Sequence, residues 1–332
     1  MKIVFLETKI WEQEYFKKKL PNMNLVFCNA EDVLEHKDAE IVCNFVNSPL
    51  SKTELDALPN LKYITTRSTG FDHIDLQECK KRNIKVSNVP TYGENTVAEF
   101  TFALLLALSR KLYLSLKQVK EFGKFSTENL CGFDLKGKKI GVVGTGHIGE
   151  HMVRIAKGFE MQVLAFDPHP KAELIQKYQV EYLSLEDLLK TADIVTLHMP
   201  YLPATHHILN AEKFKLIKSG AVLLNTSRGG LVDTSALVQA LKDGRLAGAG
   251  LDVLEEEGLL VHEDQLWQNP HPQASKLMTI LADHELMHMD NVIITPHNAF
   301  NSQEALYRIL DTTTENILGF MKSKFINLIE LK

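Results

Sequence analysis

Hydrophobic residues fall into short continuous runs separated by polar or amphipathic stretches along most of the chain. In the N-terminal part these runs lie at 3–6, 25–28, 41–45, 61–66 and 84–89. Continuous rather than alternating runs are typical of strands buried on both faces, as in a parallel sheet. The clearest helix between them is expected to open near Asp72 or Asp75 and to close at Asn83. The pattern therefore predicts a small parallel α/β unit.

The same alternation resumes further along the chain. Apolar runs lie at 140–143, just before Asp167, and at 194–197, 221–225, 249–253 and 292–295. The helices expected between them carry capping signals: Ser184 with Asp187 in a capping-box pattern, Asn210 and Asp233 as N-caps, and Gly220 and Gly244 at C′ positions. Strands alternating with helices predict a second, doubly wound parallel sheet.

Two helical stretches do not belong to this alternation. The first, 94–122, has an apolar surface wider than one packing face requires, which suggests a domain or subunit junction, although a buried core helix explains it equally well. The second, 303–321, follows the last strand and is expected to pack back on the N-terminal unit. The fold class predicted is α/β, with two Rossmann-like or flavodoxin-like domains. One, at 99–298, is inserted in a discontinuous domain made of 1–98 and 299–332.

The stretch 138–167 has the pattern of a strand, a glycine turn, a helix and a second strand. Gly144 and Gly146 follow the first apolar run, and Gly149 lies in the amphipathic segment after them. Such glycines permit a tight bend, close approach of a pyrophosphate and close packing of the helix, whose first N–H groups face the anion. A glycine turn alone also occurs as a purely structural feature. With the flanking strands in place, it predicts a dinucleotide site.

Asp167 closes the second apolar run and predicts the kind of dinucleotide. A carboxylate at this place can accept hydrogen bonds from both ribose hydroxyls and would repel a 2′-phosphate. The nearest cations are His169 and Lys171 only. The sequence therefore predicts NAD(H) rather than NADP(H) in the 99–298 domain, and assigns the substrate to the other domain.

Composition excludes several classes of protein. The 332 residues are 45% hydrophobic and 24% charged with a formal net charge of −5, which gives no electrostatic reason to bind nucleic acid or an anionic membrane. The apolar start of the chain is cut short by Glu7 and Lys9, so it predicts a first strand rather than a signal peptide. Four widely spaced cysteines are expected to be reduced thiols in a cytoplasmic protein.

Polar residues directly after the predicted strands are the candidates for chemistry, because ligands of an open parallel sheet bind beyond its carboxyl ends. They are His198, Arg228, Asp252 with Glu257, and His297. Arginine can fork onto a carboxylate or carbonyl oxygen, and a histidinium can protonate that oxygen as hydride arrives at carbon. A carboxylate beside the histidine would stabilise its charged form and fix its orientation. Such proton transfer is typically worth ~10²–10⁴-fold in rate.

Each of these residues also has a structural interpretation. Taken alone, Arg228 could be a surface arginine at a strand end, Glu257 part of a solvated acidic run, and His297 a capped loop histidine. Their shared place after strands of one dinucleotide-binding sheet favours the reduction of a 2-keto acid.

The motifs together resemble those of the D-isomer-specific 2-hydroxyacid dehydrogenases along almost the full chain. The matching segments are RSTGFDHID (67–75), VPTYGENTVAE (89–99), GVVGTGHIG (141–149), HMP (198–200), NTSRGG (225–230), GLDVLEEE (250–257) and TPHNAF (295–300). Tyr92, and the aromatic Phe300 soon after the histidine, make the D-lactate dehydrogenase branch the most similar one.

The resemblance implies a role for each matching residue. Arg228 would bind substrate, His297 would be the acid/base and Glu257 its partner, while the backbone N–H groups of Thr69 and Gly70 would hold the substrate carboxylate, with Tyr92 and Phe300 closing the pocket. Together with Gly144, Gly146, Gly149 and His198, the residues implied to line the NAD site are His147, Ile148, Asp167, Met199, Pro200, Thr205, Thr226 and Asp252. The resemblance also implies closure of two domains, a homodimer joined through its cofactor-binding domains, and reduction of pyruvate or a close 2-keto acid with NADH.

The sequence departs from the family pattern after the predicted catalytic glutamate. Gly258 stands where many members have proline, and it opens a long segment up to Asn291 that is expected to shape the edge of the cleft. The substrate is therefore the most open of the expectations. The expected absence of a C-terminal regulatory domain argues against phosphoglycerate as substrate.

Two other classes of function remain as alternatives. His284, Glu285 and His288 match the HExxH pattern of zinc proteases, without the later histidine that usually completes the ligands, so no metal is predicted. A non-enzymatic NAD-sensing protein is the other alternative, since transcriptional corepressors share the resembled fold. Retention of Arg228, Glu257 and His297 makes turnover the simpler expectation.

Overall fold

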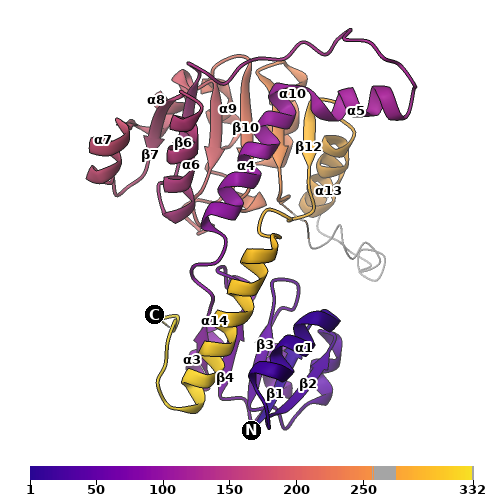
Figure 1. Cartoon of the computed structure of the whole chain (residues 1–332), viewed down its shortest axis with the longest axis vertical. Coiled ribbons are helices and arrows are strands. Elements are labelled where there is room, and N and C mark those ends of the chain that lie inside the picture. The colour runs from indigo at the N-terminus through magenta and orange to yellow at the C-terminus, as the bar shows by residue number, and fades with distance from the viewer. Residues whose placement is uncertain (256, 258–273, 331–332) are drawn as a thin grey trace. The chain divides into compact units, whose positions relative to one another are not determined.

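The structure is a computed structural model that describes residues 1–255, 257 and 274–330. It divides into two compact units (Figure 1). The first unit comprises Met1–Tyr92 and Asn301–Lys332, and the second unit is Gly93–Phe300. The boundaries expected from sequence lay after residues 98 and 298. No helix within the described ranges is both long enough and apolar enough to cross a membrane.

The described residues of the first unit form a five-stranded parallel sheet with the order β2-β1-β3-β4-β5. Its elements are β1 (Lys2–Leu6), α1 (Ile10–Lys19), β2 (Asn24–Cys28), the 3₁₀ helix η1 (Glu31–Glu35), β3 (Ile41–Asn44), α2 (Lys52–Ala57), β4 (Tyr63–Thr66), α3 (Leu76–Lys81), β5 (Lys85–Ser87) and α14 (Gln303–Met321).

Alternate residues of β1 show how this sheet is covered. Ile3 and Phe5 pack with residues of α1 and α14, whereas Val4 and Leu6 pack with residues of η1, α2 and α3. The ring of Phe320 on α14 stacks on Tyr63 of β4 with centroids 4.3 Å apart. The C-terminal helix therefore completes one face of a sheet built from the start of the chain.

The described residues of the second unit form a seven-stranded parallel sheet with the order β12-β11-β10-β9-β6-β7-β8. Its elements are α4 (Glu94–Ser109), α5 (Leu112–Lys120), β6 (Lys139–Val143), α6 (His147–Gly158), β7 (Gln162–Phe166), α7 (Ala172–Tyr178), β8 (Glu181–Tyr182), α8 (Leu185–Thr191), β9 (Ile194–Leu197), α9 (Ala211–Leu216), β10 (Ala221–Asn225), the 3₁₀ helix η2 (Gly229–Leu231), α10 (Thr234–Lys242), β11 (Leu246–Leu251), α13 (Ala274–Met287) and β12 (Val292–Ile294).

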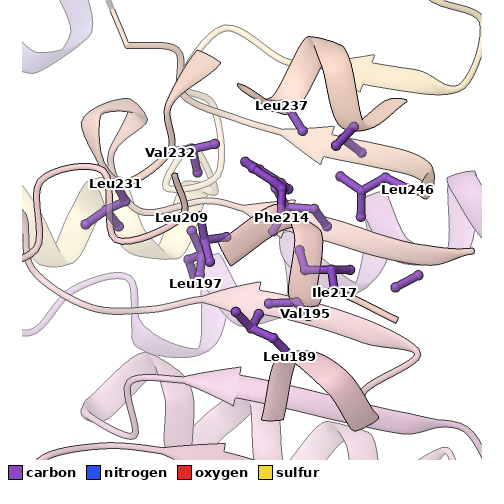
Figure 2. Packing of buried hydrophobic residues seen from close by; sticks show 14 of the residues in the cluster. Leu189, Val195, Leu197, Leu209, Phe214, Ile217, Leu231, Val232, Leu237 and Leu246 are labelled. Carbon is purple, nitrogen blue, oxygen red and sulfur yellow. The ribbon is translucent and has the colours of Figure 1, made fainter. Parts of the chain in front are cut away.

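Helices cover both faces of this second sheet. The core on one face joins the sheet to α4, α6 and α7, and Figure 1 shows α6 beside β6 and α4 beside β10. The core on the other face joins it to α8, α9, α10 and α13, and in Figure 2 Val195 and Leu197 of β9 lie beside Phe214 of α9 and Ile217, the C-cap of that helix. The predicted class of two parallel-sheet α/β domains is confirmed, and the second sheet has the strand order of a Rossmann fold with one added strand.

The stretch predicted as one long helix at 94–122 is two helices, so that prediction was wrong. The first helix, α4, ends at Ser109 and α5 begins at Leu112. Lys111 between them has φ +49°, a left-handed conformation that interrupts the helical hydrogen-bond pattern. No signal for the break is present in the sequence, because neither glycine nor proline stands there.

The three predicted N-caps and the C′ glycine Gly244 were right, whereas the capping box at Ser184 forms only in part, because the Asp187 carboxylate accepts the Ser184 hydroxyl and not its backbone N–H. Ser184, Asn210 and Asp233 accept the expected backbone hydrogen bonds at the starts of α8, α9 and α10. Gly244 has φ +68° directly after the C-cap of α10. Gly220 also has positive φ, but it lies in the turn before β10 and not at the C′ position of α9, whose C-cap is Ile217.

Candidate active site

The glycine turn lies where the strand order of the second sheet reverses. From β6 the sheet runs to β7 on one side and to β9 on the other, so the loops after β6 and β9 diverge there. Gly144 follows β6 with φ +96°, and a Cβ at this position would lie 2.5 Å from the carbonyl oxygen of His198. Only glycine fits both the conformation and the approach of the neighbouring loop.

The other two glycines shape the start of α6. A Cβ on Gly149 would lie 2.0 Å from the carbonyl oxygen of Gly144, so the helix can approach the turn this closely only because Gly149 has no side chain. At Gly146, the N-cap, a Cβ would meet no atom within 4 Å. The N-terminus of α6 therefore faces open space with its first N–H groups, which suits a pyrophosphate. Ile148 packs against the core beneath, and the His147 side chain is 76% exposed, 3.5 Å from Glu94.

Asp167 lies beside the glycine turn as predicted. Its Oδ2 accepts hydrogen bonds from the backbone N–H and the hydroxyl of Thr145, at 2.7 and 3.0 Å, and its Oδ1 accepts one from the N–H of His169 at 2.8 Å. Partial burial acts to raise the pKa of Asp167, but these hydrogen bonds outweigh it and hold the pKa below its usual range. The ionised carboxylate keeps acceptor capacity for ribose hydroxyls.

Thr145 and Tyr182 belong to this site, although the sequence analysis did not identify them. The Tyr182 hydroxyl donates to Thr145 Oγ1 at 3.0 Å and accepts from the N–H of Lys171 at 3.1 Å. Thr145 occupies the variable position between the first two glycines, which gives a weak signal, and β8, which carries Tyr182, was not predicted. The pair fixes the orientation of Asp167.

His198 ends β9 and is almost fully buried, with 8% exposure. Its Nε2 lies 2.7 Å from the hydroxyl of Thr196, while its Nδ1 has no hydrogen-bond partner among the described residues. Burial lowers the pKa of His198 to about 3, so the ring is neutral. An unpartnered polar atom in such a place is costly unless a ligand satisfies it, so His198 fits a cofactor site.

The remaining residues expected around NAD have contacts of their own. Met199 belongs to the hydrophobic core on one face of the second sheet, and the hydroxyl of Thr205 donates to the carbonyl of Pro200 and accepts from Leu202 N–H, each at 2.8 Å. The Thr226 hydroxyl lies 2.8 Å from that of Thr101 on α4. These side chains hold the loops after β9 and β10 in shape.

His297 and Glu257 are brought together from positions 40 residues apart. His297 Nδ1 lies 2.8 Å from Glu257 Oε1. The side chains are 31% and 41% exposed, so the ring is within reach of a substrate. Glu257 Oε2 also accepts the N–H of Leu254 at 3.3 Å. One ring nitrogen is thus bound to a carboxylate, which fixes the ring and leaves Nε2 as the atom that can exchange a proton.

Asp252 builds the turn that carries His297. Its carboxylate accepts from the Thr295 hydroxyl at 2.5 Å and from the N–H groups of Asn298 and Ala299 at 2.8 Å, and its carbonyl accepts from the N–H of His297 at 2.8 Å. Burial raises the pKa of Asp252, against the effect of these hydrogen bonds. His297 has φ +50°, an uncommon conformation that this set of contacts maintains.

Arg228 lies after β10, in the turn that leads into η2. Asn225 Nδ2 donates to its carbonyl oxygen at 2.9 Å, and its own Nη1 donates to the Ser227 carbonyl at 2.8 Å. Arg228 and the His297–Glu257 pair therefore follow β10, β11 and β12, three adjacent strands of one sheet, at their carboxyl ends.

Phe300 is the last residue of the second unit, which also contains Arg228, whereas Thr69, Gly70 and Tyr92 lie in the first unit. There the turn after β4 is held by side chains: Asn88 Nδ2 donates to the Thr69 carbonyl at 2.7 Å, and Ser68 Oγ donates to the Gly70 carbonyl at 2.6 Å. The carbonyl of Tyr92 accepts Nε of Arg308 at 2.7 Å. The Thr69 carbonyl shares its peptide with the N–H of Gly70, and the Ser68 carbonyl, which shares its peptide with the N–H of Thr69, accepts the N–H of Val89 at 3.0 Å, so both N–H groups are fixed.

The HExxH pattern lies at the end of α13 and just beyond it. Glu285 forms an ion pair with Lys242, and His288 Nδ1 lies 2.7 Å from the carbonyl of His284. In the parts of the chain that the structure describes, no group of three or more histidine, cysteine or acidic side chains is arranged for a metal ion. Gly258 and the first half of the segment expected to shape the cleft edge, 258–273, lie outside the described residues.

Comparisons with known proteins agree with this geometry. Residues 102–299 match the family described as D-isomer specific 2-hydroxyacid dehydrogenase, NAD binding domain. The chain is 36% identical to the D-lactate dehydrogenase of Escherichia coli over 332 residues, 98% of each chain. It is 37% identical to a 2-hydroxyacid dehydrogenase homolog of Zymomonas mobilis over 326 residues, 96% of each.

The structure is also similar to a solved one. The D-lactate dehydrogenase of Aquifex aeolicus complexed with NAD and lactic acid has a TM-score of 0.86 and 34% identity, covering 97% of this chain and 96% of that one. These matches, together with the glycine turn and Asp167, show an NAD-dependent oxidoreductase of 2-hydroxy acids. The chain belongs to the D-isomer-specific 2-hydroxyacid dehydrogenase family, in its D-lactate dehydrogenase branch.

Proposed function

We propose that this enzyme reduces pyruvate, or a close 2-keto acid, to the D-hydroxy acid with NADH. The observation that carries the proposal is the His297–Glu257 pair, 2.8 Å apart, at the same end of the sheet as the glycine turn and Asp167. An acid/base histidine at the cofactor end of a Rossmann sheet suits proton transfer to a carbonyl oxygen. The relatives named D-lactate dehydrogenase favour pyruvate as the substrate.

In this proposal each catalytic residue has one task. NADH, when bound, supplies the hydride. Arg228 binds and polarises the substrate through its forked guanidinium, and His297 donates a proton from Nε2 to the oxygen of the carbonyl being reduced. Glu257 keeps the ring of His297 in one orientation and stabilises its protonated form through Nδ1. In the oxidation of the hydroxy acid, the same Nε2 takes the proton back.

We assign the substrate carboxylate to the N–H groups of Thr69 and Gly70, with Tyr92 and Phe300 around the substrate. The hydrogen bonds to the Ser68 and Thr69 carbonyls support this assignment, because these carbonyls share their peptide groups with the N–H of Thr69 and of Gly70, and preorganised N–H donors bind an anion without a cost of reordering. The first unit is accordingly proposed to be the substrate domain.

We assign NAD to the residues around the glycine turn and to the loops after β9 and β10. The open N-terminus of α6 at Gly146, Asp167 and the unpartnered Nδ1 of His198 support this assignment. The full set proposed is Gly144, Gly146, His147, Ile148, Gly149, Asp167, His198, Met199, Pro200, Thr205, Thr226 and Asp252.

We also propose that the enzyme is a homodimer joined through its cofactor-binding domain. On α5 the side chains of Leu112, Tyr113, Leu116 and Val119 are 46 to 56% exposed and recur at helical spacing. A contiguous apolar strip of this kind on one helix is typical of a surface that another chain covers. A second copy is the partner that the proposal names. A cytoplasmic location goes with it, because all four cysteines are free thiols.

The decisive experiment is NADH oxidation over a panel of 2-keto acids with chiral analysis of the product. We expect the highest kcat/KM with pyruvate or a near analogue and a D product. An L product, or no turnover on any member of the panel, would contradict the proposal. Tight NADH binding without turnover would instead identify an NAD-sensing protein, and a preference for a bulkier 2-keto acid would move the enzyme to another substrate within the family.

A further inference from the structure

Three loops that carry proposed site residues meet at one side chain, Glu255. The loop after β9 contains His207, the turn after β10 carries Arg228 and leads to Thr234, and the segment after β11 contains both Glu255 and Glu257. Because these loops are far apart in sequence, their relative positions depend on contacts between them. None of the roles proposed above uses Glu255 or His207.

The carboxylate of Glu255 binds both other loops at once. Its Oε1 lies 2.5 Å from Nε2 of His207, and its Oε2 accepts the hydroxyl of Thr234 at 2.9 Å. The Glu255 and His207 side chains are only 15% and 29% exposed. The ring of His206 stacks on that of His207 with centroids 3.8 Å apart, which fixes the plane of the imidazole. A partly buried pair with fixed geometry holds its partners more firmly than an exposed surface pair does.

The backbone of the Arg228 turn is enclosed by the same loops. A Cβ at Gly229 would lie 2.1 Å from the carbonyl carbon of Leu254, so the turn rests directly on the peptide that precedes Glu255. The N–H of His207 donates to the carbonyl of Gly230 at 2.9 Å. Arg228 is therefore followed by two glycines whose positions are set by the Leu254–Glu255 peptide and by His207.

We propose that Glu255 and His207 are positioning residues that hold the turn of Arg228 and the segment of Glu257 in their catalytic arrangement. The inference rests on the proposed function, since it concerns the groups proposed to bind substrate and to orient His297. Misplacing such groups by about 1 Å costs up to ~10²-fold in rate. Loss of the pair should therefore weaken substrate binding and slow turnover. NADH affinity should change little, because the glycine turn after β6 and Asp167 after β7 are left unaltered, although Thr205 of the proposed NAD set lies in the same loop as His207.

The test compares His207→Leu with His207→Gln. Leucine removes the hydrogen bond to Glu255, whereas the amide of glutamine can donate to the carboxylate in place of Nε2. We expect His207→Leu to lower kcat and to raise the Kd of oxamate, an analogue of pyruvate, by about tenfold or more. The NADH Kd should change by less than about twofold, and His207→Gln should restore most of the loss. Glu212→Gln, which breaks the exposed pair with Lys215 on α9, is the matched control.

A double-mutant cycle with Glu255→Leu tests whether the two residues act together. We expect kcat and oxamate affinity to fall little further in the double variant than in either single variant, because each single change already breaks the pair. Hydrogen exchange at residues 226–233 supplies a readout that needs no substrate, and it should become faster in His207→Leu and not in Glu212→Gln.

Two results would overturn the inference. One is His207→Leu with unchanged exchange at 226–233, unchanged oxamate binding and unchanged kcat. The other is a parallel loss of NADH affinity, oxamate affinity and thermal stability that His207→Gln does not restore, which would mean a general structural role. If the proposed substrate is wrong, wild-type enzyme will neither turn over pyruvate nor bind oxamate, while faster exchange in His207→Leu would still support the inference.

Discussion

The residues proposed for proton transfer and cofactor binding are held by unusual local contacts. His297 has positive φ, and its backbone N–H donates to the carbonyl of Asp252. Its Nδ1 lies within hydrogen-bond distance of Glu257 Oε1. Asp167 has two oxygens already oriented by Thr145 and His169. Each such residue combines a reactive or recognising group with neighbours that fix it, so substitutions at these positions should separate binding from chemistry.

Replacing His297 by alanine should abolish proton transfer and leave the cofactor site intact. We expect kcat to fall by ~10²–10⁴-fold while the NADH Kd stays within about twofold. Stopped-flow turnover and NADH fluorescence titration measure the two quantities. His288→Ala, which removes a histidine of the HExxH pattern, is the control and should keep full activity. An equal loss of NADH affinity in His297→Ala would show that its role is misassigned.

Asp167→Asn should weaken the preference for NADH over NADPH. The variant loses the charge that binds ribose hydroxyls and repels a 2′-phosphate, so KM for NADH should rise about tenfold. The ammonium of Lys171, four residues after Asp167, lies 3.0 Å from Glu150, so Glu150→Gln in the same chain should improve NADPH use further. Steady-state kinetics with both cofactors measure this. An unchanged ratio of the two kcat/KM values would contradict the assignment.

The buried His198 should make the folded state sensitive to acid. Its pKa is about 6.5 when unfolded and about 3 when folded, so the unfolded chain binds the proton first. The contribution of neutral His198 to the free energy of unfolding is complete above pH 6.5. It is lost as the pH falls toward 3, by up to ~1.4 kcal/mol per pH unit. Urea unfolding between pH 7 and pH 5 should show that the free energy of unfolding falls more steeply with pH in wild type than in His198→Gln. Equal slopes would mean that His198 is not the group responsible.

Several helices of this fold start where the local sequence provides a side-chain partner for free backbone N–H groups. Ser184, Asn210 and Asp233 each accept a backbone N–H at a helix start, and all three were identified from the sequence. The break between α4 and α5 at Lys111 has no such local signal. Breaks of this kind are decided by packing, since α4 is buried against the sheet and α6 whereas α5 exposes its apolar residues.

Ser184→Ala should lower the free energy of unfolding by about 1 kcal/mol. The Ser184 hydroxyl caps α8 by accepting the N–H of Asp187 at 3.1 Å, and caps of this kind contribute ~0.5–2 kcal/mol. Chemical denaturation of wild type and variant gives the difference. Ser184→Asn, which retains a capping oxygen, should recover most of it. A loss that asparagine fails to recover would indicate a role other than capping.

At the scale of the whole molecule, α5 carries an apolar strip that the described residues leave exposed. If α5 forms the dimer contact, Leu116→Glu should place a charge in it and shift the protein to monomers at micromolar concentration. Light scattering coupled to size exclusion measures the mass. Lys215→Glu on α9 serves as a control for added negative charge. A wild-type monomer, or a Leu116→Glu variant that remains a dimer, would rule out this surface.

Sequence alone determined the fold class, most strands, three of the helix caps and the glycine turn with Asp167. These features arise from local patterns, since buried parallel strands are apolar throughout, caps need particular side chains, and Gly144 and Gly149 have no room for a Cβ. The candidate set of Arg228, Glu257 and His297 followed from one rule about strand ends together with a family resemblance. Their catalytic roles remain predictions.

Tertiary structure alone decided which side chains meet. Three sets of contacts join residues that lie far apart in the chain. His297 pairs with Glu257, Asp252 accepts hydrogen bonds from the turn that carries His297, and Glu255 binds His207 and Thr234. In the sequence Glu255 and Glu257 are neighbours in one acidic run, with no sign that each has a different histidine as its partner. The fold separates them because they lie after β11 between two other loops, and the distances between loops depend on packing across the sheet rather than on any local pattern.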